Sequence, residues 1–76
     1  MIPDPVDVAD SYARGLADKA ECPTVADASA MYADALRTYG PDGVEWSIVN
    51  RAIIKRWSKS ALERIKRAAW KEAPRG

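Results

Sequence analysis

Histidine and phenylalanine are absent from this sequence, and cysteine occurs only once, at Cys22. A zinc site draws on several Cys or His ligands, and Ser–His or Cys–His nucleophilic catalysis requires an imidazole. The composition therefore excludes these two kinds of site. Carboxylates alone could act in acid–base catalysis, but the acidic residues lie at predicted helix starts and on polar faces, where solvation explains them. We expect no metal, no cofactor and no enzymatic activity.

Other absences concern the cellular compartment. A single cysteine cannot form an internal disulfide, which is typical of proteins in a reducing environment. The N-terminal residues MIPDPVDVAD are acidic and interrupted by proline, whereas a signal peptide has a basic start and an apolar core. No apolar run approaches the roughly 20 residues of a membrane-spanning helix. These features predict a cytoplasmic protein with no membrane partner.

Charge is balanced overall but divided unevenly along the chain. Residues 1–43 carry three basic and eight acidic side chains, whereas residues 44–76 carry nine basic and three acidic ones. Such asymmetry suggests that the two halves attract each other, or that the basic half faces an anionic partner. Attraction between the halves of two chains would produce a homodimer, which would bury surface that a small domain leaves exposed.

Hydrophobic periodicity predicts the fold. Apolar residues recur at helical spacing in four segments, and we expect helices over approximately residues 5–21, 24–39, 43–57 and 60–73. The predicted fold class is all-α, a single domain built as a small antiparallel bundle of three or four short helices. The residues expected at its centre are Tyr12, Leu16, Tyr32, Leu36, Trp46, Val49, Ile53, Trp57, Leu62 and Ile65.

Capping and helix-breaking residues set the predicted boundaries of the first two helices. Asp4 can cap the first helix, with Pro5 at its first position, and Cys22-Pro23 ends it. Thr24 and Asp27 form a weaker version of the capping box at the start of the second helix. Gly40-Pro41 stops the second helix, and Asp42 or Gly43 is expected to open the third. Cys22 is expected to pack as a small residue against the core.

Two residues inside the predicted helices stand out. Gly15 is unfavourable within a helix, so it suggests close approach by a neighbouring helix. Asn50 falls on the apolar face between Trp46 and Trp57, where a buried amide requires a hydrogen-bond partner. We expect Asn50 to tie the third helix to the backbone of a neighbour; contact with a ligand is the alternative.

The segment Trp57-Ser58-Lys59-Ser60 is ambiguous. Ser60 and Glu63 form a capping-box pair and Ser58 could cap equally well, which predicts a break and a separate fourth helix. The alternative is one continuous helix, because a single apolar stripe also fits the spacing from Trp46 to Ala68. We favour the break because a helix of about 30 residues is exceptional in so small a domain.

The predicted fourth helix carries the candidate binding surface. Arg64, Arg67 and Lys71 form a basic arc on one outer flank, and Trp70 lies nearly opposite the inward face, beside Lys66. Tryptophan and arginine are enriched at binding hot spots, so Arg64, Arg67, Trp70 and Lys71 are predicted to bind a protein partner. The alternative is that Trp70 folds back over its neighbours, or that this helix is covered on both sides.

Nucleic acid is the alternative partner. Two helices joined by a short turn, the second of them basic, resemble the outline of a helix-turn-helix, although the turn lacks the glycine often found there. Lys and Arg on a solvated helix face are also common without any such role. The residues that would contact DNA or RNA are Lys55, Lys59, Arg64, Arg67 and Lys71.

Residues 40–71, GPDGVEWSIVNRAIIKRWSKSALERIKRAAWK, resemble small uncharacterised accessory proteins of phages that infect actinobacteria. The similarity is carried by Trp46, Asn50, Arg51, Ala52, Ile53, Arg56, Trp57, Ser58, Leu62, Ile65, Lys66, Ala69 and Trp70. The acidic N-terminal half does not contribute to it. The resemblance implies a phage-encoded effector that binds and modulates a host protein in the host cytoplasm, and it implies no catalytic residues.

Overall fold

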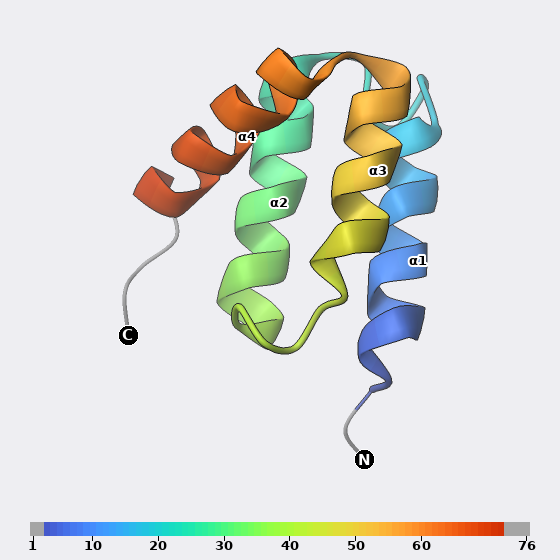
Figure 1. Cartoon of the computed structure of the whole chain (residues 1–76), viewed down its shortest axis with the longest axis vertical. Helices are drawn as coiled ribbons and strands as arrows, with labels where there is room; N and C mark the ends of the chain where they lie inside the picture. The colour runs from blue at the N-terminus through green and yellow to red at the C-terminus, as the bar shows by residue number, and fades with distance from the viewer. Residues whose placement is uncertain (1–2, 73–76) are drawn as a thin grey trace.

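The computed structural model describes residues 3–72, which form four helices and no strand. The helices are α1 (Pro5–Ala17), α2 (Val25–Tyr39), α3 (Trp46–Arg56) and α4 (Lys59–Glu72). In Figure 1, α1, α2 and α3 run alternately up and down beside one another, and α4 crosses obliquely at one side. The predicted all-α bundle is confirmed, with the fourth helix inclined to the other three. None of the helices in this part of the chain has the length and apolar character needed to cross a membrane.

The helices pack in two interleaved pairs. α1 packs mainly against α3, and α2 packs mainly against α4. No Cα atom of α2 lies within 8 Å of a Cα atom of α3, although the two helices are neighbours in the bundle. Large side chains therefore fill the space between α2 and α3, and this space is where the candidate site lies.

The core contains most of the residues predicted for it. Seven of the ten are buried, while Tyr12, Trp46 and Trp57 are half-buried at its edge. The remaining core volume is largely alanine, at Ala9, Ala28, Ala33, Ala35 and Ala69. Alanine is a weak hydrophobic signal in a sequence, but its small side chain lets helix backbones approach closely. Cys22 is fully buried, as predicted, and burial raises the pKa of its thiol despite the nearby Arg56.

The first helix is shorter than predicted. It ends at Ala17 rather than near residue 21, because Asp18 leaves the helical conformation. The Asp18 carboxylate accepts a hydrogen bond from the Ala20 backbone N–H at 2.8 Å, and its carbonyl oxygen accepts one from Cys22 at 2.8 Å. This local turn competes with the helix, as Asp side chains commonly do. Ala20, which lies within the predicted helix, is exposed as a result.

The predicted caps of the first two helices are present. The Asp4 carboxylate accepts a hydrogen bond from the Val6 backbone N–H, with Pro5 at the start of α1. Thr24 and Asp27 form a reciprocal capping box at the start of α2. Gly40 ends α2 with φ of 79°, a backbone conformation that favours glycine.

The third helix begins later than predicted. It starts at Trp46, after an irregular segment over 40–45, rather than at Asp42 or Gly43. Val44 is buried within this segment, and the Glu45 backbone N–H donates to the Pro5 carbonyl oxygen at 3.2 Å. Tertiary contacts to α1 therefore hold this segment, and they override the local signals that suggested an earlier start.

The third and fourth helices are separate, as favoured from the sequence. Trp57 and Ser58 form the break, and the Ser58 hydroxyl accepts a hydrogen bond from the Ala61 backbone N–H at 3.1 Å. Ser58 rather than Ser60 is therefore the cap, and α4 begins at Lys59, one residue before the predicted position. The predicted end of this helix at residue 73 lies outside the described residues.

α1 contacts α3 through Arg56 and contacts α2 through Met31. The Arg56 guanidinium donates to the Leu16 carbonyl oxygen at 2.6 Å, so the end of α3 satisfies a carbonyl in the last turn of α1. The same guanidinium lies 4.3 Å from the centroid of the Trp57 ring. A Cβ atom placed on Gly15 would lie 2.6 Å from Met31 Cε of α2. Gly15 thus leaves room for the end of the Met31 side chain, which is a looser contact than the predicted close approach of a neighbouring helix.

Candidate binding cleft

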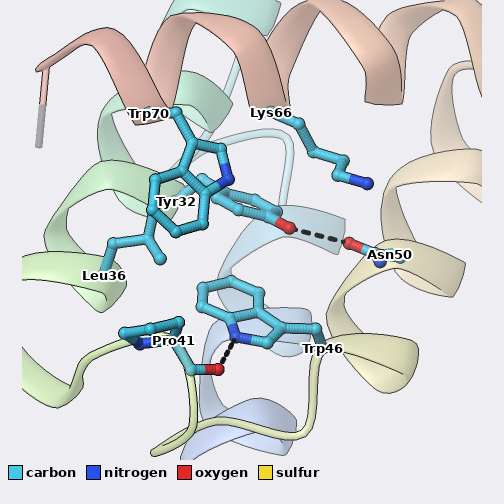
Figure 2. A pocket seen from close by; sticks show the side chains of 7 residues that line it. All are labelled: Tyr32, Leu36, Pro41, Trp46, Asn50, Lys66 and Trp70. Atoms are coloured by element: carbon cyan, nitrogen blue, oxygen red, sulfur yellow. Dashed lines mark hydrogen bonds between the residues drawn. The ribbon is translucent and has the colours of Figure 1, made fainter.

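A small cleft of about 270 Å³ lies where α2, α3 and α4 meet. Its lining residues come from all three helices and from the segment that joins α2 to α3, as Figure 2 shows. They are Tyr32, Leu36, Pro41, Trp46, Asn50, Lys66 and Trp70. We refer to this feature as the aromatic cleft, because three of its seven lining residues are aromatic.

The Tyr32 and Trp46 rings form one wall of the aromatic cleft. They stack with their centroids 4.4 Å apart and their planes inclined by 24°. The Trp46 indole N–H donates to the Pro41 carbonyl oxygen at 2.7 Å, which fixes the orientation of the indole (Figure 2). Because this polar group is already paired, Trp46 presents an apolar surface to the cleft.

Asn50 lies beside this aromatic wall. Its amide oxygen accepts a hydrogen bond from the Tyr32 hydroxyl at 3.1 Å. The prediction that Asn50 bonds to a neighbouring helix is right, but the expected backbone partner is wrong. The backbones of α2 and α3 are too far apart for that contact, so the tyrosine side chain spans the gap. With its oxygen occupied, the Asn50 amide retains two N–H donors.

Burial of Tyr32 makes the stability of the fold depend on pH. The side chain is buried, and burial raises the pKa of its phenol to about 12. Because the phenol binds its proton more tightly in the folded state than in the unfolded state, folding is stabilised while the phenol is protonated in both, below pH 10. This contribution to the free energy of unfolding is lost as the pH rises from 10 towards 12. We therefore expect Tyr32→Phe to lose less stability than the wild type between pH 10 and 12, measured by urea unfolding at each pH. Tyr39→Phe, at an exposed position, is the control; equal losses in wild type and Tyr32→Phe would contradict the prediction.

Trp70 and Lys66 form the opposite side of the aromatic cleft. Trp70 is 44% exposed, and its indole lies over Tyr32 and Leu36 (Figure 2). The predicted outward indole and the alternative of a covered one each apply in part, because one part of the indole lines the cleft and the rest faces solvent. Lys66, one helical turn before Trp70, is half-buried and extends its ammonium group towards Asn50 (Figure 2).

The predicted binding residues of α4 do not all lie at this cleft. Trp70 lines it, whereas Arg64, Arg67 and Lys71 are exposed and do not. The alternative nucleic-acid residues Lys55 and Lys59 are exposed as well, and they too lie outside the lining. The sequence placed Lys66 beside Trp70 but did not mark it as a binding residue. Tyr32, Leu36 and Trp46 were assigned to the core, because no sequence pattern shows which core side chains meet Trp70. Asn50 was assigned to a contact between helices, with a ligand contact as the alternative.

The two charged halves of the chain are not joined by ion pairs within residues 3–72. The ion pairs found there are Arg14–Asp10 at 3.0 Å in α1 and Arg37–Asp34 at 4.0 Å in α2, both on exposed side chains. The Tyr12 hydroxyl donates to Asp34 at 3.0 Å; burial and this contact raise the pKa of Tyr12 to about 12. The basic side chains of α3 and α4 therefore keep an uncompensated positive charge over this part of the chain.

The described residues contain no group of three or more His, Cys, Asp and Glu side chains placed to hold a metal ion. Comparison of the chain with known protein families, with curated proteins and with solved structures finds no match.

Proposed function

We propose that this protein is a non-enzymatic protein-binding module whose partner docks on α4 at the aromatic cleft. The observation that carries the proposal is Trp70, a large indole that is 44% exposed at the mouth of a cleft it shares with Trp46 and Tyr32. Partly exposed tryptophans beside a preformed apolar recess are typical of binding hot spots, because a partner side chain can bury them further.

The charge of α4 supports an acidic partner surface. Arg64, Arg67 and Lys71 are exposed on the same helix as Trp70, and none of them forms an ion pair within residues 3–72. Cations at the rim of an interface accelerate association with an acidic partner more than they tighten the final complex. We therefore assign the affinity to Trp70 and the cleft, and assign steering of the partner to the three cations.

The similarity of residues 40–71 to accessory proteins of actinobacteriophages supports a host protein as the partner. Under this proposal the chain is a small phage effector that acts in the host cytoplasm. The similar positions include Trp46, Asn50, Lys66 and Trp70, four of the residues that line the aromatic cleft.

A second candidate function is nucleic-acid binding, and the uncompensated charge of α3 and α4 favours it. The side chains concerned are Lys55, Lys59, Arg64, Arg67 and Lys71, all exposed. The two-residue connection between α3 and α4 has the outline of a helix-turn-helix. This candidate leaves Trp70 and the aromatic cleft without a role, so we rank it second.

Affinity capture from a nuclease-treated lysate of an actinobacterial host tests the proposal. The wild type is expected to retain a specific protein, and Trp70→Ala is expected to retain at least about tenfold less of it, as for a hot-spot residue. Val6→Ala is the matched control, because Val6 is an exposed apolar residue on α1 outside the cleft. Circular dichroism confirms that each variant is folded.

Three outcomes would count against the proposal. Capture of no specific protein would contradict it, as would equal capture by Trp70→Ala. Capture that depends on undigested nucleic acid and is lost in Arg64→Glu/Arg67→Glu would support the second candidate instead.

A further inference from the structure

The aromatic cleft combines an apolar recess with hydrogen-bond donors on one side. Tyr32, Trp46 and Trp70 supply flat apolar surfaces, and Leu36 and Pro41 complete the recess. No Asp or Glu is among the lining residues. The polar groups that face the cleft are therefore the ones that decide which ligand atoms it accepts.

The Pro41 carbonyl oxygen and the Tyr32 hydroxyl are already hydrogen-bonded to Trp46 and Asn50, and the polar groups left without a partner in residues 3–72 are donors. The Lys66 ammonium can only donate, and the amide N–H groups of Asn50 are left free because its oxygen is bonded to Tyr32. The Trp70 indole N–H makes no hydrogen bond to residues 3–72, and Figure 2 shows this nitrogen on the side of the ring that faces Lys66. A cation beside unpaired N–H donors selects an anionic acceptor such as a carboxylate.

The volume of the cleft limits the occupant to about one residue. At about 270 Å³ it lies below the roughly 300–1,000 Å³ of typical small-molecule sites. A cleft of this size favours an apolar group and a carboxylate that come from a single residue. In an extended peptide, neighbouring side chains point in opposite directions, so an internal acidic residue and its apolar neighbour cannot both enter. A carboxyl-terminal residue carries its side chain and its α-carboxylate on one Cα atom.

We propose that the aromatic cleft binds the carboxyl-terminal residue of a partner protein, with its apolar side chain between Trp46 and Trp70 and its α-carboxylate on Lys66 and Asn50. This inference rests on the proposed protein-binding function and specifies which part of the partner is recognised. The carboxylate supplies the negative charge that Lys66 lacks within residues 3–72.

Titration of the whole chain with short synthetic peptides tests the inference. The probes are N-acetylated Gly-Ser peptides that end in Leu or Phe, each made with a free carboxylate and with a carboxyl-terminal amide. Binding is followed by NMR through the three tryptophan indole N–H signals. We expect the Trp46 and Trp70 signals to shift while that of Trp57, which lies outside the cleft, stays in place. The amide is expected to bind about tenfold or more weakly, because it loses charge-assisted hydrogen bonds.

Lys66→Met supplies the decisive variant. It should bind the free acid and the amide alike, whereas Lys71→Met, on an exposed lysine of the same helix outside the cleft, should keep the preference for the acid. Equal binding of acid and amide by the wild type would overturn the inference, as would tight binding of an amidated peptide with an internal Asp-Leu pair. No shift at millimolar peptide would also overturn it. If lysate capture still depended on Trp70 in any of these cases, the proposed function would stand and this inference alone would fail.

Discussion

Ile65→Ala is expected to destabilise the fold by about 2–5 kcal/mol, as for other deletions of large buried aliphatic side chains. Ile65 is fully buried in α4 at the centre of the core. By the usual scaling with length, a chain of 76 residues has a total stability of about 4–11 kcal/mol. A single substitution can therefore remove a large fraction of it, since the cavity cannot fully close within a close-packed interior.

Urea unfolding followed by tryptophan fluorescence measures this effect. Ile54→Ala is a matched control, because Ile54 on α3 is 40% exposed and should change the free energy of unfolding by no more than about 0.5 kcal/mol. Similar unfolding midpoints for the two variants would mean that α4 does not pack into the core as described.

Gly43→Ala has the second large expected effect. A Cβ atom at Gly43 would lie 2.2 Å from the Tyr39 carbonyl oxygen and 3.0 Å from its carbonyl carbon, both backbone atoms at the end of α2. Backbone atoms cannot move aside as a flexible side chain can, so the segment over 40–45 must shift. We expect a loss of about 1–3 kcal/mol, as for other substitutions that overpack a tight site.

The same substitution should also disturb the aromatic cleft. Pro41, which accepts the hydrogen bond from the Trp46 indole, belongs to the segment that must move. We expect urea unfolding to report the lost stability, and the indole N–H signal of Trp46 to shift in NMR spectra of the folded variant. Asp42→Ala, at an exposed position next to Gly43, should leave both unchanged. An unaltered Trp46 signal in Gly43→Ala would show that this glycine does not hold the cleft wall in place.

Much of the fold could be predicted because local chemistry determines it. The capping and stop residues act within a few residues of their own position, and each forms the predicted cap or stop. They are Asp4 with Pro5 at the start of α1, Thr24 with Asp27 at the start of α2, and Gly40 at its end. Ile53 of α3 and Ile65 of α4 are both buried, as expected from the apolar face of each helix. The break between α3 and α4 depends on a serine cap, and the sequence offered two serines without deciding between them.

The remaining features depend on contacts between distant residues. The segment over 40–45 is held by α1 rather than by its own helix signals, so the start of α3 was predicted too early. The aromatic cleft requires Tyr32, Trp46 and Trp70 to meet from three helices, and helical spacing reports only the face within each one. The sequence likewise shows that Asn50 needs a hydrogen-bond partner, but it does not show that this partner is the Tyr32 hydroxyl of another helix.

The interleaved pairing of the helices has a consequence for folding. Because α1 packs mainly on α3 and α2 mainly on α4, no two consecutive helices form a self-sufficient hairpin. Each major interface closes a loop that contains another whole helix, so the entropy of loop closure is lost before most apolar contacts can form. We therefore expect the chain to gain little stability from any two consecutive helices, and most of it once α3 has packed on α1 and α4 on α2.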